Sequence, residues 1–273
     1  MRISIHILTR DRFNELALLL QSLRSQTYQD FDVILVDQSK PAPIFSNHFL
    51  MSIINRMKLE NHCFKIEIDN ITGCCHGRNK CIEIDYFDNP LTLRLDDDVI
   101  LEPDYIEKLM KGIEKYDLVS GVIPILSQPE WIRKVEKIGK IINEHKLDSE
   151  GNLTEMKDEC GYCYDEEKLI PTHHFRTNAL YKSNKNLKYP THLSPVAFRE
   201  EGFFSLKAII DFNYKLGVNT GAIAYHLQTP SGGNRCQNYS YLVQQDHQLF
   251  LNWIKKKFKE KGDFINKYNE SLK

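Results

Sequence analysis

The chain has 273 residues, enough for one large α/β domain or two small ones, and 41% of them are hydrophobic, which is ample for a buried core. Its 36 basic and 37 acidic residues give a formal charge of -1, so the overall balance excludes a nucleic-acid binder that works by neutralising phosphates. Any partner must therefore be recognised by local sites.

The start of the sequence lacks the apolar core and the cleavage site of a signal peptide, and no stretch reaches the roughly 18 apolar residues that a membrane-spanning helix needs. The seven cysteines are an odd number at irregular spacing, which fits a reducing compartment better than a disulfide framework. We therefore expect a cytoplasmic protein.

Strand-like and helix-like patterns alternate through the first part of the chain. Short apolar runs predict strands at 3–8, 31–36, 65–68, 91–95 and 118–126. Apolar residues at helical spacing predict helices after Phe13, at about 77–86 and after Pro103. Strands separated by helices predict a parallel sheet with right-handed crossovers, in which ligands bind at the carboxyl ends of the strands.

The later part of the chain is less regular. The mostly polar segment 127–169 predicts an insertion, with a turn at 148–152 that could join the two strands of a hairpin. The remaining patterns predict a helix at 203–216 with Gly217 as its C-cap, a strand at 221–226, a glycine-rich loop at 229–234 and a basic amphipathic helix at 245–261.

Three adjacent acids, Asp96, Asp97 and Asp98, follow directly after the predicted strand at 91–95. Carboxylates this close repel one another unless a cation is present. Mg²⁺ and Mn²⁺ take oxygen ligands and bind through one or two carboxylates plus substrate phosphates. The alternative is a solvated turn that leads to the next helix, and the position after a buried strand favours the metal site.

Four segments then show a resemblance, in matching order, to the signature blocks of family 2 glycosyltransferases. They are ISIHILTRDRFNELALLLQSLRSQTYQDFDVILVDQS, GRNKCIEI, LRLDDDVILEPDYIEKL and REEGFFSLKAIIDFNYKLG. The resemblance covers most of 3–126 and again about 198–235, and a set of four blocks is more specific than any one short motif. It implies an α/β protein of the GT-A type, with a Rossmann-type, mainly parallel sheet flanked by helices.

The resemblance also implies an activity and a division of the chain. A sugar would pass from a nucleotide-sugar donor, with a UDP-sugar as the first candidate, to a hydroxyl of a glycan or other acceptor, with inversion, as in polysaccharide biosynthesis. We expect a single domain with a nucleotide-sugar-binding half at 1–126, an acceptor-binding half with the insertion at 127–244, and a C-terminal amphipathic helix at 245–273.

The resemblance assigns donor contacts to residues at the predicted strand ends and to the metal motif. The nucleoside would contact Thr9, Arg12 and Asp37, and the donor would also contact Arg78; for Asp37 the alternative is an ordinary Asx-turn. Asp96 and Asp98 would hold the metal ion, while Asp97 is either a spacer or a ribose contact. Arg235, in the glycine-rich loop, could contact a phosphate as part of a lid.

The catalytic base would lie at the start of the helix near residue 200. Removal of a proton from a sugar hydroxyl needs a carboxylate on the acceptor side. Glu200 and Glu201 occupy the place of the family's Glu-Asp pair, with Glu201 favoured, although glutamate replaces aspartate here and Gly202 follows. The alternative is a pair of acids that only stabilises a helix N-terminus. His226 could be a further metal ligand, which would favour Mn²⁺, or a structural histidine.

Two other patterns carry weaker expectations. Cys160 and Cys163, with His173 and His174 nearby, hint at a zinc site, but a single Cys-x-x-Cys pair is weak and incidental cysteines are favoured. The lysines of 245–261 could contact an anionic membrane surface and place the protein at the inner face of the membrane, while a helix docked on the sheet is the favoured alternative.

Two rival functions stay open at this point. A haloacid-dehalogenase-type phosphatase would also place an Asp-x-Asp loop after a strand, but that loop normally follows the first strand of the core, and here three strand-helix units precede it. A non-catalytic member of the same fold, which binds a saccharide or a nucleotide, is the other rival, because the sequence at Glu201 and Gly202 departs from the family pattern.

Overall fold

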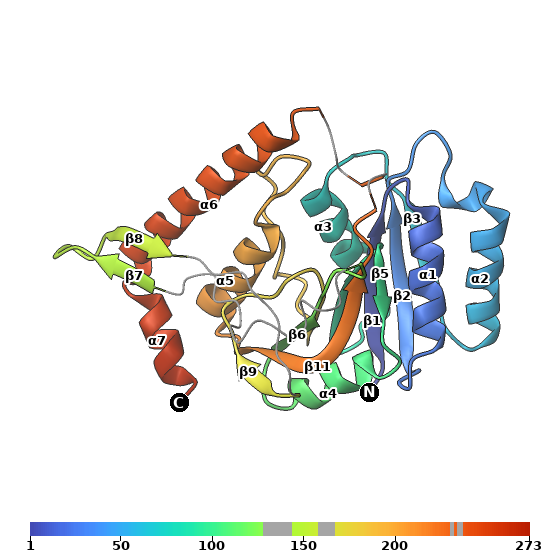
Figure 1. Ribbon diagram of the computed structural model, residues 1–273, viewed down its shortest axis with the longest axis horizontal. Helices are drawn as coiled ribbons and strands as arrows, with labels where there is room; N and C mark the ends of the chain where they lie inside the picture. The colour runs from blue at the N-terminus through green and yellow to red at the C-terminus, as the bar shows by residue number, and fades with distance from the viewer. Residues whose placement is uncertain (128–143, 158–166, 230–231, 234–236) are drawn as a thin grey trace.

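The computed structural model describes residues 1–127, 144–157, 167–229, 232–233 and 237–273 (Figure 1). The first half contains β1 (Ile3–Thr9), α1 (Phe13–Arg24), β2 (Phe31–Asp37), η1 (Ile44–Ser46), α2 (His48–Leu59), β3 (Phe64–Ile68), α3 (Cys74–Ile84), β4 (Leu91–Asp96), β5 (Val99–Leu101), α4 (Tyr105–Ile113) and β6 (Leu118–Val122). The second half contains β7 (Glu144–Leu147), β8 (Leu153–Lys157), β9 (Leu169–Pro171), β10 (Ala179–Lys182), α5 (Glu200–Phe212), β11 (Leu216–His226), α6 (Tyr239–Lys261) and α7 (Phe264–Ser271).

One central sheet organises the molecule, with the strand order β3-β2-β1-β4-β10-β6-β11-β5, and β9 pairs with β11. The neighbours from β3 to β4 are parallel, as the alternation of strands and helices predicts. Beyond β4 the sheet is mixed, because β10 is antiparallel to both β4 and β6, and β5 and β9 are antiparallel to β11. The expected α/β class with a sheet flanked by helices is confirmed, and β6 and β11 form a further parallel pair beyond β4.

Helices cover both faces of this sheet (Figure 1). The largest core cluster packs α1, α2 and α4 against Ile3, Ile5 and Ile7 of β1 and their neighbours. A second cluster joins α5, α6 and α7, and α3 packs on the face of β1 and β2 that carries Leu8 and Ile34. Side chains alternate between the faces of a strand, so residues of β4 at even positions face the side of α3 and α5.

Several expected boundaries differ from those in the structure. The helix expected at 203–216 is α5, which ends at Phe212, and its C-cap is Asn213 with φ 56°, not Gly217. Asparagine accepts this left-handed conformation at a helix end nearly as well as glycine. Gly217 instead lies in β11, where an added Cβ would come within 2.3 Å of the Tyr116 ring, so this glycine permits close packing rather than a turn.

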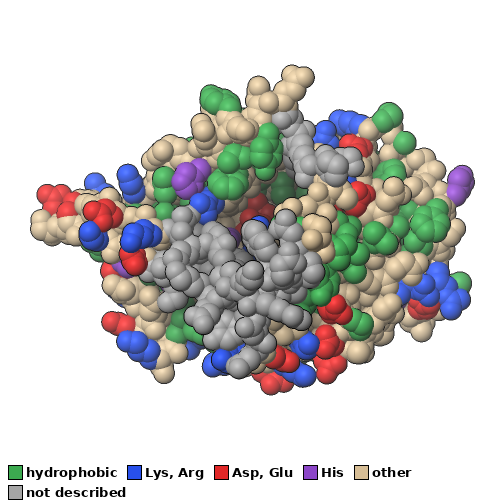
Figure 2. All heavy atoms as spheres, viewed as in Figure 1, with side chains coloured by type: hydrophobic (Ala, Val, Ile, Leu, Met, Phe, Trp, Pro, Cys, Tyr) green, Lys and Arg blue, Asp and Glu red, His purple; other side chains and the backbone are tan. Residues whose placement is uncertain are grey.

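The insertion contains the expected hairpin, formed by β7 and β8 around the turn at 148–152. Its surface carries charges of both signs at the edge of the molecule (Figure 2), including the ion pairs Lys146–Glu155 and Lys157–Glu144. The hairpin packs toward α6 and the start of α7, where His145 contacts the Phe258 ring of α6 and Asp263, the N-cap of α7. The expected C-terminal helix is longer than predicted and is followed by α7.

The apolar side of α6 is buried. Phe250, Ile254 and Phe258 each have no exposed surface and belong to the second core cluster. Across the part of the chain that the structure describes, no helix combines the length and the apolar character needed to cross a membrane.

Candidate active site

A cavity of about 610 Å³ opens at the carboxyl ends of β1 and β4, beside the N-termini of α3 and α5. Its walls come from distant parts of the chain. The lining includes most of the residues that the sequence singles out: Thr9, Arg12, Arg78, Asp96, Asp97, Asp98, Glu200, Glu201 and His226. Further lining residues are Gln38, Cys74, Arg94, His174, Arg176, Thr177 and Arg199. A volume of this size is typical of a small-molecule site.

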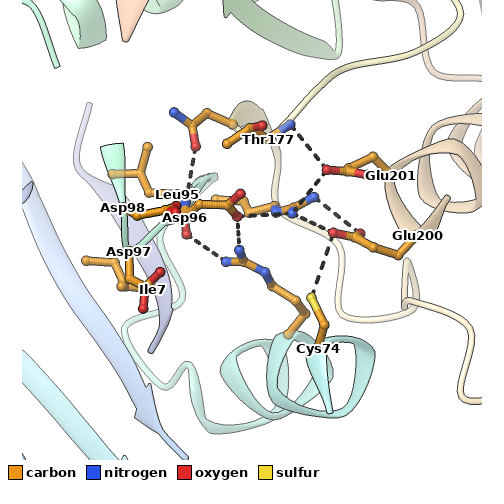
Figure 3. A network of polar contacts seen from close by, with 12 residues as sticks. Ile7, Cys74, Leu95, Asp96, Asp97, Asp98, Thr177, Glu200 and Glu201 are labelled. Atoms are coloured by element: carbon orange, nitrogen blue, oxygen red, sulfur yellow. Dashed lines mark hydrogen bonds and ion pairs between the residues drawn. The ribbon is translucent and has the colours of Figure 1, made fainter. Parts of the chain in front are cut away.

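Asp96, the first acid of the triplet, is held by two guanidinium groups. Arg78 donates to Asp96 Oδ1, and Arg94 Nη2 lies 3.2 Å from the same oxygen (Figure 3). The Asp96 backbone N–H donates to Asn178 Oδ1 at 3.1 Å. Gly77 lets α3 approach β1, because an added Cβ there would lie 2.3 Å from Leu8 Cδ1, and this approach brings Arg78 to the acids.

Asp97 and Asp98 share Arg12. Its Nη1 lies 3.1 Å from Asp97 Oδ1 and 2.8 Å from Asp98 Oδ2. Thr9 Oγ1 donates to Asp97 Oδ2 at 2.8 Å, and His226 Nε2 lies 3.2 Å from Asp98 Oδ2. The adjacent carboxylates were expected to need a metal ion to offset their mutual repulsion. In the structure, arginine and histidine side chains already reduce that repulsion.

The environment separates the protonation behaviour of these two acids. Burial raises the pKa of Asp97 to about 6, and the charge of Arg12 limits the rise. Burial also acts against the charged form of Asp98, but the hydrogen bond and charge of His226, together with Arg12, bring the pKa of Asp98 below its ordinary value. Asp98 is therefore the more firmly ionised carboxylate.

Asp37 has a different environment from the one expected. It is fully buried, outside the cavity lining, and its two oxygens accept backbone N–H groups from Ser39 at 2.8 Å and Ile44 at 2.6 Å. This arrangement corresponds to the Asx-turn alternative. The next residue, Gln38, lines the cavity, and its Nε2 donates to Ile71 O at 2.7 Å.

The two glutamates at the start of α5 differ sharply. Glu200 is buried, and its Oε1 lies 2.6 Å from Arg94 Nη2 and 3.9 Å from Cys74 Sγ (Figure 3). Burial raises the pKa of Glu200 to about 8, and the Arg94 charge limits the rise. The side chain of Glu201 is 23% exposed, and its Oε1 accepts the Thr177 backbone N–H at 3.3 Å.

Arg94 is a site residue that the sequence reasoning missed. It lies in the middle of the apolar run of β4, with a side chain only 3% exposed, and its guanidinium lies 5.3 Å from the centre of the Phe175 ring and 5.6 Å from that of Tyr189. A charge inside a buried strand is the signal that could have identified it, because such a charge needs partners.

The sequence also suggested a zinc site. Cys160 and Cys163 lie outside the described residues, as does Arg235. His173 Nε2 contacts Asn269 Oδ1 at 2.7 Å, and burial lowers the pKa of His174 to about 3. Within the described segments, no three His, Cys, Asp or Glu side chains are grouped as ligands for one metal ion. Asp98 and His226 form a pair of candidate metal ligands.

Comparison with known proteins decides the family. The family model described as "Glycosyl transferase family 2" matches residues 4–165, more than half of the chain. The chain belongs to this family. This membership sets aside the haloacid-dehalogenase-type phosphatase as an alternative. A search of curated proteins found no match to this chain.

Solved structures agree with the expected GT-A fold. The glycosyltransferase resembles S. aureus TarS 1–349 in complex with UDP-GlcNAc, with a TM-score of 0.57 and 13% identity over 94% of this chain and 73% of that one. For S. aureus TarS 1–349 the TM-score is 0.54 and the identity 14%, over 83% of this chain and 60% of that one. For S. aureus TarS the TM-score is 0.52 and the identity 14%, over 94% of this chain and 44% of that one. This chain thus spans between 44% and 73% of the length of these neighbours, and the likeness concerns the fold.

Proposed function

We propose that this glycosyltransferase moves a sugar from a nucleotide-sugar donor, with a UDP-sugar as the first candidate, to a hydroxyl of a glycan or other acceptor, with inversion. One observation carries the proposal: a single cavity contains the acid triplet at the end of β4 and the glutamates at the start of α5. The complex of the structural neighbour TarS with UDP-GlcNAc supports a donor of this class.

The donor would bind at the β1 and β4 side of the cavity. Thr9, Arg12 and Asp97 form a connected polar group there, suited to hydroxyl and phosphate oxygens. Arg78 lies on the other side of the acids, and its two terminal nitrogens are engaged by Asp96 and the Leu95 carbonyl. Its contact with a diphosphate would require a rearrangement of that pair.

A divalent cation fits this site through Asp98 and His226. Their facing atoms are 3.2 Å apart, both residues line the cavity, and a carboxylate with an imidazole is a donor set that accepts Mn²⁺ or Mg²⁺ alongside phosphate oxygens. Arg12 Nη1 lies 2.8 Å from the same Asp98 oxygen, so an ion bound there would displace Arg12 from it. Such an ion would neutralise negative charge on the departing nucleoside diphosphate. Asp96 would join the set through Oδ2, because both of its arginines contact Oδ1.

Glu201 is the better base of the two glutamates. Its side chain is partly exposed in the cavity, whereas Glu200 is buried and holds Arg94 through both of its oxygens. A base must reach the acceptor hydroxyl with an unoccupied oxygen, and only Glu201 meets this condition. Its carboxylate would accept the proton as the hydroxyl attacks the anomeric carbon from the face opposite the diphosphate.

The experiment is a turnover assay with a panel of nucleotide sugars, with Mn²⁺, Mg²⁺ or EDTA. Wild-type protein should release nucleoside diphosphate in a metal-dependent way, and NMR of the product should show the inverted anomer. Glu201→Gln should lower kcat by roughly 10²- to 10⁴-fold while calorimetry shows unchanged donor binding. Glu60→Gln is the matched control, because Glu60, the C-cap of α2, forms an ion pair with Arg24 of α1 outside the cavity lining. Full turnover by the Glu201 variant would remove this residue from the base role.

We also propose a peripheral contact with anionic lipid through α6. Lys255, Lys256, Lys259 and Lys261 are exposed, whereas the apolar side of α6 is buried in the core. The contact would therefore be electrostatic, without insertion of apolar side chains, and would weaken with added salt.

A further inference from the structure

We propose that Arg94 is a positioning residue that fixes the base relative to the acid triplet. The inference rests on the proposed function, because it takes Glu201 as the base. Arg94 Nη2 lies 3.2 Å from Asp96, 2.6 Å from Glu200 and 3.7 Å from Glu201 (Figure 3). A single guanidinium thus contacts the end of β4 and the start of α5.

The surroundings of Arg94 allow little freedom. Its side chain is only 3% exposed, and the rings of Phe175 and Tyr189 lie within cation-π distance. A buried cation requires paired acids, and here the two terminal nitrogens make all the contacts with carboxylates that the structure describes. The planar fork of arginine can hold several carboxylates in fixed directions, which the single ammonium of a lysine cannot do.

The start of α5 depends on this group. The N-cap residue, Arg199, has φ 70° and makes no side-chain hydrogen bond to the first turn. Instead the first helical residue, Glu200, is held by Arg94 Nη1 at 3.3 Å and Nη2 at 2.6 Å. Since Glu201 is the next residue, the ion pair determines where the base lies. Thr177 is a second, weaker restraint on Glu201, through a backbone N–H at 3.3 Å.

Arg94 therefore connects the two sides of the reaction. Asp96 adjoins the residues proposed to bind the donor, and Glu201 faces the acceptor. A shift of about 1 Å between reacting groups can lower a rate on the order of 100-fold. The connection thus predicts a loss in kcat, with KM for the donor close to that of the wild type, because Thr9, Arg12 and Asp97 remain in place.

A single replacement cannot separate this role from stability, because removal of one partner leaves a buried charge without its counter-ion. The test therefore compares Arg94→Met, Glu200→Met and the double variant. Each single variant should lose stability, and the double variant should regain most of it, because replacement of a buried pair by apolar residues of similar volume is often neutral and Asp96 keeps its ion pair with Arg78. If Arg94 positions the base, kcat of the refolded double variant stays on the order of 100-fold low. Recovery of kcat together with stability would overturn the inference.

Arg24→Met with Glu60→Met is the matched control, because it removes a two-bond Arg–Glu pair, of 2.8 and 2.6 Å, between α1 and the end of α2. This control should keep wild-type kcat. If the wild-type protein turns over no nucleotide sugar, that result counts against the proposed function and not against the role of Arg94.

In that case the role of Arg94 is tested by amide hydrogen exchange at 199–203. Faster exchange in the stable double variant than in the wild type supports the inference, and an unchanged exchange rate overturns it.

Discussion

Replacement of Asp37 by alanine would decide whether this buried acid holds its own loop or the donor. Its two oxygens accept the N–H groups of Ser39 and Ile44 at 2.8 and 2.6 Å, and all three residues are buried. A hydrogen bond to a charged acceptor contributes about 1.5 to 3 kcal/mol, so the loss of two should lower the free energy of unfolding by about 3 to 6 kcal/mol. For a chain of this size that corresponds to a Tm lower by roughly 10 °C.

The assay is urea unfolding followed by circular dichroism, with donor KM measured on the folded protein. The midpoint should fall with little change in slope. Asp37→Asn keeps one acceptor oxygen and should show a smaller loss. An unchanged midpoint with a donor KM at least roughly tenfold higher, the equivalent of about 1.4 kcal/mol of binding, would refute the reasoning and return Asp37 to the nucleoside site.

Three further outcomes are expected. Thr9→Val removes the 2.8 Å bond to buried Asp97 and should lower the free energy of unfolding by about 1 to 3 kcal/mol, as read from urea midpoints; an unchanged midpoint would contradict a structural contribution. Burial opposes protonation of His226, but Asp98 raises the pKa of His226 above its ordinary value. The stability that this pair contributes is therefore complete below the pKa of His226 in the unfolded chain. It is lost as the pH rises through the pKa of His226 in the folded protein. NMR titration of Asp98→Asn without metal should give a lower pKa for His226, and an unaltered titration would argue against the pair. The protein should co-sediment with anionic but not with neutral vesicles at low salt. Substitution of the exposed lysines at 255–261 by glutamine should abolish this binding, and a variant that still binds would exclude α6 as the contact.

Local sequence patterns predicted the first half of the sheet well. The runs that form β1, β2 and β4 are rich in apolar residues because these strands are buried, and the acid triplet begins at the end of β4. In β3 polar and apolar residues alternate, and the strand is only partly buried. The same kind of signal was present for α2, where Leu50, Ile53, Ile54 and Met57 follow helical spacing, although no helix was predicted there. By contrast, β10 has only four residues, and its position depends on partners far along the chain.

The sequence identified the acidic residues of the candidate site but not the ion pairs that they form with arginines. Asp96, Glu200 and Glu201 stood out by residue type and context, and the structure places them around one cavity. The pairing of Arg94 with Glu200 joins residues 106 positions apart, which no local pattern can reveal. For Asp37 the sequence left two alternatives open, because a carboxylate at a strand end can accept backbone or ligand donors equally well.

The place of β10 in the sheet affects how the chain can fold. This strand comes late in the sequence, yet it lies between β4 and β6, which are made much earlier. Until 179–182 is available, β4 and β6 each keep an open edge, which is a template for pairing with another chain. Contacts of such large sequence separation slow folding. A fragment that ends near residue 126 should therefore aggregate rather than behave as an independent donor-binding unit.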